Sequence, residues 1–450
     1  MSHLSVAKFG GTSVANYPAM QSCANIVIAD PNTRVVVLSA SAGITNLLVA
    51  LANGCEESER NKLLNEVRQI QENILTELKD DSRVRPKIEA LLANITSLAE
   101  AANLATSLAL TDELISHGEM MSSLIFVEVL RELQIEATWL DVRTIVATNS
   151  HFGKAAPNDE QTRQNCDNLL KPLIERGELV ITQGFIGRDE QGKTTTLGRG
   201  GSDYSAALLA EVLNAQDVLI WTDVAGIYTT DPRIVQTAQR IDTMSFSEAA
   251  EMATFGAKVL HPATLLPAVR SNIPVYVGSS KAPQDGGTWV TRNPQPRPTF
   301  RAIALRRDQT LLTLSSLNML YAQGFLANIF TILAKHKISV DTITTSEVSV
   351  ALTLDKTGSA SSGKSLLSQE LIEELSQFCT VKVDTGLSLV ALIGNELHTA
   401  SGVAKRIFET LDAYNIRMIS YGASTNNICL LADSDKADDI VRSLHRSLFE

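Results

Sequence analysis

The sequence predicts an α/β protein, in which a large N-terminal layered domain precedes two smaller units of the ferredoxin-like type. The first 292 residues alternate short apolar runs with helical patterns, which is typical of an α/β layered domain. Residues 281–299 hold four prolines and two glycines, a composition that indicates a loop or linker. Beyond it the chain repeats itself. We therefore expect domains at 1–292, 309–385 and 386–450, joined by a linker at 293–308.

The N-terminal domain shows a regular succession of strand and helix patterns. Residues 56–105 are rich in Glu, Lys, Leu and Ala and helical in period, with Pro86 as a break, so we expect an added, partly exposed helical hairpin. Strands are expected at 4–9, 34–39, 137–141, 179–182, 217–221 and 274–277, and helices at 17–29, 45–53 and 112–133.

The C-terminal repeat is the clearest internal signal. GFLANIFTILAKHKISVDTITTS (324–346) aligns without a gap with GVAKRIFETLDAYNIRMISYGAS (402–424), so that Gly324 matches Gly402. Each copy reads as a strand, a helix begun by glycine, two strands and a further helix. This is the β-α-β-β-α-β order of a ferredoxin-like unit. Two such copies would either share a sheet or pack face to face.

Composition excludes several classes of protein. The net charge of −11, with acids and bases interspersed, argues against nucleic-acid binding. No run approaches the roughly 20 apolar residues of a membrane helix, and no basic-then-apolar signal region opens the chain. Five scattered cysteines without a C-x-x-C pair indicate free thiols in a reducing cytoplasm, and the histidines show no metal-binding spacing.

The stretch VAKFGGTS (6–13) places a lysine at a strand end, followed by Gly10 and Gly11. Glycines after a strand let backbone N–H groups approach an anion closely, and Lys8 could add a point charge on a phosphoryl group. The P-loop pattern is absent, because the lysine precedes the glycines. An ordinary strand–turn–helix with a solvated lysine is the alternative.

Two further motifs have both a functional and a plain reading. In SASAGIT (39–45), small and hydroxyl residues follow a strand, as in a ligand crevice, although a turn that caps the next helix would look the same. In HGEMMSSLIFVEVL (117–130), Glu119 stands at an expected helix start. It is either a favourable helix-start charge or a carboxylate that holds a substrate ammonium.

The stretch TTTLGRGGSDYSAALLA (194–210) favours function, because structural glycines alone would need neither Arg199 nor Asp203. Arg199 could clamp a carboxylate in a bidentate fork, and Asp203 could orient a lysine. WTDVAGIYTTDPR (221–233) suits adenine and phosphate, or is merely a turn. Lys258, in FGAKVLHP (255–262), is either a ligand or a solvated helix residue.

Together these motifs resemble the amino-acid kinase family and, within it, the monofunctional lysine-sensitive aspartokinases. The C-terminal repeat is similar to the tandem ACT domains that sense amino acids, so the resemblance covers almost the whole chain. It implies a carbamate-kinase-like α/β/α sandwich followed by two ferredoxin-like ACT domains. Rival interpretations are another amino-acid kinase, acting on glutamate or acetylglutamate, and an inactive kinase-like sensor.

The resemblance also implies an activity and roles for residues. MgATP would give its γ-phosphoryl to the β-carboxylate of L-aspartate, with Lys8 stabilising the transferring group and Asp203 orienting Lys8. Magnesium would be held mainly by phosphate oxygens and water, so no protein metal ligand is expected. Aspartate would be bound by Ser39, Thr45, Glu119, Arg199 and Ser202, and ATP by Lys8, Gly10, Gly11, Thr222, Asp223, Tyr228, Arg233 and Lys258.

The two repeat copies differ where an effector would bind. Asp341 is matched by Ile419 and Glu347 by Thr425, so only the first copy offers two carboxylates. That suits lysine better than threonine, although methionine or threonine stays open and both acids could be solvated turn residues. The bulky Tyr321 has no evident role. The resemblance implies a dimer or dimer of dimers and an effector near Met319, Phe325, Leu326, Ser339, Val340, Asp341, Ser346 and Glu347, between ACT domains.

Overall fold

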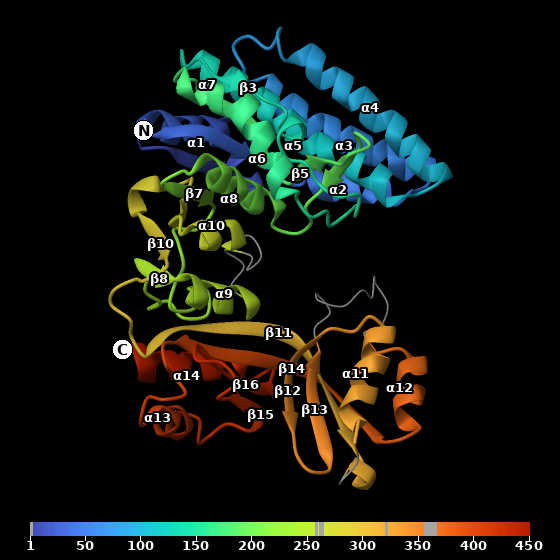
Figure 1. The fold of residues 1–450 in the computed structure, drawn as a ribbon, viewed down its shortest axis with the longest axis vertical. Helices are drawn as coiled ribbons and strands as arrows, with labels where there is room; N and C mark the ends of the chain where they lie inside the picture. Colours follow the sequence, from blue (N-terminus) through green and yellow to red (C-terminus); the bar gives the residue numbers. More distant parts are fainter. Residues whose placement is uncertain (1–2, 257–259, 261–264, 320–322, 355–366) are drawn as a thin grey trace. The chain divides into compact units, whose positions relative to one another are not determined.

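The computed structural model describes residues 3–256, 260, 265–319, 323–354 and 367–450 (Figure 1). The chain forms two compact units, each built from three segments. The first unit comprises Met1–Ile227, Arg240–Ala250 and Lys258–Gln295, and the second comprises Tyr228–Gln239, Glu251–Ala257 and Pro296–Glu450. No helix among the described residues is long and apolar enough to cross a membrane.

The first unit is built on an eight-stranded sheet in the order β3-β4-β2-β1-β7-β9-β10-β8. Neighbouring strands from β3 to β9 are parallel, and β10 is antiparallel to β9. The six expected strands are confirmed, although the one at 137–141 is shorter: β1 (Ser5–Phe9), β2 (Thr33–Leu38), β3 (Thr138–Trp139), β4 (Val180–Gln183), β7 (Asp217–Thr222) and β9 (Val275–Ser279). The sequence did not predict β8 (Thr243–Ser245) or β10 (Gly287–Thr291), and β10 lies within residues 281–299, which were wrongly expected to be only loop or linker. A separate hairpin joins β5 (Ile186–Arg188) to β6 (Thr194–Thr196).

Helices cover both faces of this sheet. Phe9 belongs to a core cluster with residues of α1, α2 and α5, whereas the next residue back, Lys8, reaches Asp203 of α8. Because successive side chains of a strand point to opposite faces, α8 covers the face away from α5. The expected helices at 17–29, 45–53 and 112–133 are confirmed. The helices are α1 (Tyr17–Ala29), α2 (Ile44–Ala52), α5 (Leu108–Glu132), α6 (Asp159–Asn165), α7 (Lys171–Glu175), α8 (Gly201–Leu213), α9 (Phe246–Thr254) and α10 (Leu266–Ser271).

The helical hairpin expected at 56–105 is present as α3 (Glu57–Leu75) and α4 (Arg85–Leu104). Pro86 does not break a helix but lies in the first turn of α4, where its missing N–H costs nothing. The apolar stripes of both helices, including Val67 and Ile95, join the same core cluster as α2 and α5. The hairpin is therefore part of the core of the first unit and not an appended module.

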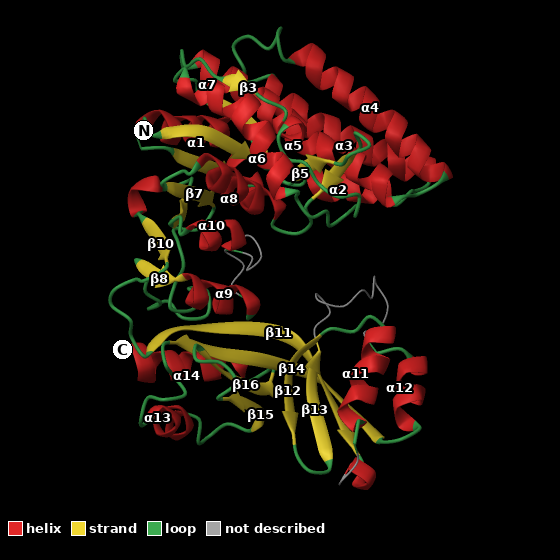
Figure 2. Cartoon of the chain, in the orientation of Figure 1, coloured by secondary structure: helices red, strands yellow, loops and turns green. Residues whose placement is uncertain are grey.

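The second unit holds a six-stranded antiparallel sheet in the order β12-β13-β11-β14-β16-β15, so the two repeat copies share one sheet (Figures 1 and 2). Separate core clusters lie under the two copies. The strands are β11 (Phe300–Ser315), β12 (Val340–Thr345), β13 (Ser349–Leu354), β14 (Thr380–Gly394), β15 (Ile416–Tyr421) and β16 (Asn427–Asp433). The helices are α11 (Phe325–Lys335), α12 (Gln369–Ser376), α13 (Val403–Thr410) and α14 (Ala437–Phe449).

Two long strands tie the copies together. The end of β11 pairs with the start of β14, from Leu311↔Asp384 to Ser315↔Thr380, and completes the first copy. The start of β11 pairs with the end of β14, from Phe300↔Gly394 to Arg306↔Leu389, and completes the second. Residues 300–308, expected as linker, are therefore strand. Each copy borrows its fourth strand from the other, so the unit folds as one body.

Two segments that the sequence assigned to the N-terminal domain belong to the second unit. Val235 lies in the core cluster of the second copy, and Thr229 hydrogen-bonds His445 of α14 at 2.9 Å. Further on, Ser424 donates a hydrogen bond to Glu251 of α9 at 2.8 Å. The boundary between the units falls within α9, whose residues 246–250 belong to the first.

Candidate active site

The candidate site lies where the central parallel strands end. Backbone hydrogen bonds hold the loops after β1, β2 and β7 together. The Gly10 N–H donates to the Trp221 carbonyl oxygen at 3.0 Å, and the Ser39 N–H donates to the Phe9 carbonyl oxygen at 3.2 Å. A side chain on Gly11 would meet the Ala40 carbonyl oxygen at 2.7 Å, so only glycine allows this approach. In open α/β sheets this carboxyl edge is where ligands bind.

Lys8 and Asp203 form an ion pair at this edge. Lys8 Nζ lies 2.6 Å from Asp203 Oδ1, and the two side chains are only 11% and 14% exposed. Asp203 stands in the first turn of α8, which starts after Gly200 in the left-handed conformation (φ 75°). The expected orientation of Lys8 by Asp203 therefore agrees with the geometry. The Lys8 ammonium also lies 3.7 Å from where a Cβ on Gly10 would stand, directly over the glycine loop.

Glu119 is a buried carboxylate with an open acceptor. It is 3% exposed, and among the described residues its Oε2 has no hydrogen-bond partner. Burial raises its pKa to about 8, which backbone N–H groups, including that of Ala40, and the charge of Lys8 only partly oppose. Such a group binds a cation readily, because an ammonium would satisfy both its charge and its free oxygen.

The position of Glu119 within its helix differs from expectation. The helix starts at Leu108, so Glu119 lies well inside it and owes nothing to a helix-start dipole. Instead, α5 is pressed against the loop after β2. A Cβ on Gly118 would meet Ala40 Cβ at 2.7 Å, and Ser122 Oγ donates to the Ser39 carbonyl oxygen at 2.8 Å. Close packing thus aims Glu119 at the strand ends.

The remaining predicted substrate residues surround this edge. Ser202 in α8 packs tightly on Gly184, which follows β4. A Cβ on Gly184 would lie 2.6 Å from the Ser202 Cβ. Ser39 and Thr45 are half-buried, and α2 begins at Ile44 with Gly43 as its N-cap. Arg199 is exposed and, among the described residues, makes no hydrogen bond or ion pair. Its guanidinium is therefore available to a ligand carboxylate.

The predicted nucleotide residues do not all lie in the first unit. Thr222 and Asp223 follow β7, and the Thr222 carbonyl accepts from Ser280 N–H at 2.8 Å. Tyr228 and Arg233 belong to the second unit. There the 89% exposed Arg233 makes a paired contact with Asp231, at 2.6 Å for the shortest distance. Lys258 and, in the predicted effector region, Tyr321 lie outside the described residues.

The sequence reasoning missed Asp112, two turns before Glu119 on α5. Its buried carboxylate accepts from Thr196 N–H and Thr196 Oγ1, both at 2.8 Å, and from Gly153 N–H at 2.9 Å. Burial raises its pKa despite these bonds. Asp112 thus anchors the strand that leads into the Arg199–Asp203 loop. A lone acid on an apolar helix face was the only signal that could have revealed it.

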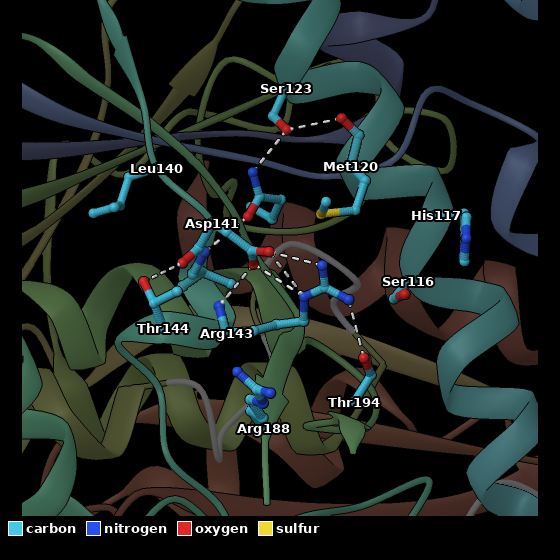
Figure 3. A network of polar contacts seen from close by, with 12 residues as sticks. Ser116, His117, Met120, Ser123, Leu140, Asp141, Arg143, Thr144, Arg188 and Thr194 are labelled. Atoms are coloured by element: carbon cyan, nitrogen blue, oxygen red, sulfur yellow. Dashed lines mark hydrogen bonds and ion pairs between the residues drawn. The ribbon is translucent and has the colours of Figure 1, made fainter. Parts of the chain in front are cut away.

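A second missed network braces the same helix (Figure 3). Arg143 pairs with Asp141 at 2.7 Å and donates to Thr194 Oγ1 of β6 at 3.0 Å. The Gln183 amide donates to Ser123 Oγ of α5 at 2.9 Å. His117 on the same helix is buried, which lowers its pKa and keeps the ring neutral. These contacts fix β6 relative to α5 and so stabilise the candidate site.

The predicted effector residues form two groups in the second unit. Ser339, Val340 and Asp341 stand at the start of β12, whereas Ser346 and Glu347 are exposed beyond its end. Ser316 N–H donates to the Val348 carbonyl oxygen at 2.9 Å, which links the latter end to the segment of Met319 before α11, and Phe325 and Leu326 open α11 itself. Asp341 and Ser346 are five positions apart along β12 and its end, which corresponds to roughly 16 Å for an extended strand and exceeds the length of an extended lysine.

Comparison with known proteins gives the family. The model of the amino acid kinase family matches residues 3–279, and an ACT domain model matches residues 390–448. Over 450 residues the chain is 62% identical to lysine-sensitive aspartokinase 3 of Escherichia coli (strain K12), covering 100% of both chains. The chain belongs to the amino acid kinase family. It is also 35% identical to the chloroplastic aspartokinase 3 of Arabidopsis thaliana, over 99% of this chain and 81% of that one.

Solved structures of this family agree over the whole chain. E. coli aspartokinase III in complex with aspartate and ADP (R-state) matches with a TM-score of 0.90 and 61% identity, covering 100% of both chains. The same enzyme in complex with lysine and aspartate (T-state) matches with a TM-score of 0.87 and the same coverage. The resemblance to the aspartokinases is confirmed, as is the kinase fold with a C-terminal ACT region. The chain is an enzyme of this kinase family.

Proposed function

We propose that this chain is an aspartate kinase inhibited by L-lysine. It transfers the γ-phosphoryl group of MgATP to the β-carboxylate of L-aspartate and yields 4-phospho-L-aspartate and ADP. This is the first step of the aspartate pathway to lysine, threonine and methionine, and we expect it to run in the cytoplasm. The observation that carries the proposal is the Lys8–Asp203 pair at 2.6 Å, at the same strand ends as a buried Glu119 carboxylate with an open oxygen.

In the transfer, an oxygen of the aspartate β-carboxylate attacks the γ-phosphorus, and the bond from that phosphorus to the β,γ-bridging oxygen breaks. The carboxylate is already a nucleophile, so no protein base is needed. The enzyme must hold two anions in line and offset their repulsion. Lys8 acts on the transferring group, and Asp203 keeps the Lys8 ammonium over the glycine loop. Their burial strengthens both effects, because water screens buried charges less.

Substrate selection is assigned to charges of opposite sign around the loop after β2. Glu119 accepts the α-ammonium of aspartate through its open Oε2, and the exposed Arg199 binds the α-carboxylate. Ser39, Thr45 and Ser202 line the site between them. The position of Glu119 on a well-packed helix supports selection by length, since a longer substrate would misplace the reacting carboxylate.

The nucleotide is assigned to the glycine loop and the loop after β7. The Gly11 N–H suits a phosphate oxygen, and Gly10, whose own N–H donates to the Trp221 carbonyl oxygen, lets the phosphate approach closely. Thr222 and Asp223 border the same edge. Tyr228, Arg233 and Lys258 remain proposed ATP residues. Magnesium enters with the nucleotide, held by phosphate oxygens and water, where it offsets phosphate charge.

Lysine inhibition is assigned to the first repeat copy. The separation of Asp341 from Ser346 along β12 supports an effector site completed by a second copy of the chain. We therefore propose a homodimer, or a dimer of dimers, formed through the ACT region. Light scattering coupled to gel filtration, with and without lysine, tests this; a monomer under both conditions contradicts it.

The proposed activity is tested by trapping its product. Hydroxylamine converts an acyl phosphate into a hydroxamate, so hydroxamate and ADP should form together with aspartate and not with glutamate. The control omits the amino acid and measures background ATP hydrolysis. Hydroxamate from glutamate alone would favour another amino-acid kinase, and none from either substrate would refute the kinase proposal.

A further inference from the structure

Arg306 in β11 lies between the predicted effector carboxylate and the end of α9. Its Nη1 is 3.4 Å from Asp341 Oδ1 and 3.4 Å from the Thr254 carbonyl oxygen. The Arg306 and Asp341 side chains are 18% and 16% exposed, so water screens their interaction only in part. All three residues belong to the second unit. A single guanidinium therefore contacts both the effector region and α9.

The Asp341 carboxylate is only half satisfied. Its Oδ2 is buried and, among the described residues, has no hydrogen-bond partner. Burial raises the pKa of Asp341 although Arg306 opposes the shift. An unpaired buried acceptor is costly, and a ligand ammonium at Oδ2 would relieve that cost. The carboxylate thus keeps one unused acceptor oxygen for a second cation while its other oxygen pairs with Arg306.

The second repeat copy carries a different arrangement of charges at the same place. The positions that match Arg306 and Ser339 hold Asp384 and Arg417, which form their own ion pair at 3.4 Å. Arg417 also contacts Asp433 at 3.4 Å, so this arginine is shared between two acids. The charges are reversed and paired within the chain. Among the described residues of the two copies, only Asp341 in the first has a buried carboxylate oxygen without a hydrogen-bond partner.

The end of α9 is held by the second unit at several places. Glu251 accepts hydrogen bonds from Ser424 Oγ at 2.8 Å and Asn427 Nδ2 at 2.7 Å. Gly256, at φ 113°, packs so closely that a Cβ would lie 2.7 Å from the Leu305 carbonyl oxygen. A shift of Arg306 would therefore change its contact with the end of α9. The first residues of this helix belong to the first unit.

We propose that Arg306 is the positioning residue that couples effector binding at Asp341 to α9. The inference rests on the proposed function and deepens it. When the side-chain ammonium of lysine binds Oδ2, two cations share one carboxylate, and their repulsion weakens the hold of Arg306 on Asp341. Arg306 and the Thr254 end of α9 then adopt a different arrangement. Differential contacts of this kind are what an effector needs to shift an equilibrium.

The test is the reciprocal coupling between lysine and the substrates. Lysine affinity is measured by calorimetry on the full chain, with and without saturating aspartate and ADP. The wild type should show affinities that differ by about fivefold or more, within the usual range of coupling. In Arg306→Gln the ratio should fall to nearly one, while lysine still binds and turnover without lysine stays near normal. Arg307→Gln is the matched control, because Arg307 is the next residue in the chain and contacts Asp438, not Asp341.

Two results would overturn the proposal. If the ratio of lysine affinities with and without aspartate and ADP is the same in Arg306→Gln as in the wild type, Arg306 does not take part in the coupling. If that variant no longer binds lysine, Arg306 belongs to the binding site and is not a coupling residue. If the glutamine variant does not fold, Arg306→Met removes the charge but keeps an apolar stem of similar length, and the same two results apply. Hydroxamate formation by the wild type is scored separately. An active wild type that does not bind lysine overturns the effector assignment and this coupling, but not the kinase assignment.

Discussion

Lys8 Nζ lies 2.6 Å from Asp203 Oδ1, although the two residues are 195 positions apart in the chain. The pair joins the end of the central strand β1 to the first turn of α8 and fixes a cation over the glycine loop. In a site that moves a phosphoryl group between two anions, a cation held in advance costs no reorganisation during the reaction. This arrangement and its surroundings lead to five predictions.

Replacing Lys8 should impair chemistry more than binding. Lys8→Ala is expected to lower kcat by about 10²–10³, the range found when a transition-state donor is removed, and to change nucleotide affinity far less. Coupled ADP release measures kcat, and calorimetry measures ADP binding. Lys87→Ala, at an exposed site on α4, is the control. An unchanged kcat in Lys8→Ala would contradict the assigned role.

Glu119 should make aspartate binding depend on pH. Its pKa of about 8 means that the free enzyme holds this carboxyl mostly protonated at pH 7, whereas an ammonium needs the ionised form. Aspartate affinity should therefore rise as pH increases towards about 8 and level off above it. In Glu119→Gln the affinity should be lower and lose this pH dependence. A titration of aspartate KM from pH 6 to 9 measures both.

The same pKa predicts a change in stability of the ligand-free enzyme. A carboxyl whose folded pKa is raised stabilises the fold while it is protonated, and this contribution declines as pH rises from the unfolded pKa, near 4.5, towards 8. Glu119→Gln stays neutral and should lose that decline. Thermal unfolding of both proteins at pH 6 and 8 checks it; parallel changes in Tm would contradict the buried state of Glu119.

Asp112 should affect both the stability of the fold and the position of β6. Asp112→Ala leaves buried N–H donors of Thr196 and Gly153 unpaired, which should cost about 2–6 kcal/mol, at roughly 1–3 kcal/mol for each buried donor left unpaired. Asp112→Asn keeps one acceptor oxygen and should cost less. Denaturant unfolding measures stability. Aspartate KM should rise in the alanine variant, because β6 leads into the Arg199 loop; equal stability of the two variants would refute the anchor.

Asp341 should be needed for lysine and dispensable for turnover. Asp341→Ala removes the carboxylate with the open oxygen, so the lysine concentration for half inhibition should rise about tenfold or more, as expected for one charged hydrogen bond of about 1.5–3 kcal/mol. Turnover without lysine should stay near normal. Asp412→Ala, an exposed acid in the second copy, is the control. Identical inhibition curves for Asp341→Ala and wild type would contradict the assignment.

The sequence predicted those features of the fold and the site that local patterns and recognisable motifs determine. Apolar runs located the parallel strands, the repeat identified two ferredoxin-like copies without deciding whether they share a sheet, and the order of lysine and glycines placed Lys8 at a strand end. It did not predict the exchange of strands between the repeat copies, because residues 300–308 look like a linker until β14 is there to pair with them. It missed Asp112 and Arg306 because their partners are distant in sequence, at Thr196 and Asp341.

The rate of aspartyl hydroxamate formation, with lysine, threonine and methionine each titrated alone, tests the central claim most directly. We predict hydroxamate and ADP in equal amounts, inhibition by lysine, and little effect of threonine or methionine. Absence of hydroxamate would contradict the kinase assignment, and inhibition by threonine but not by lysine would contradict the role given to Asp341.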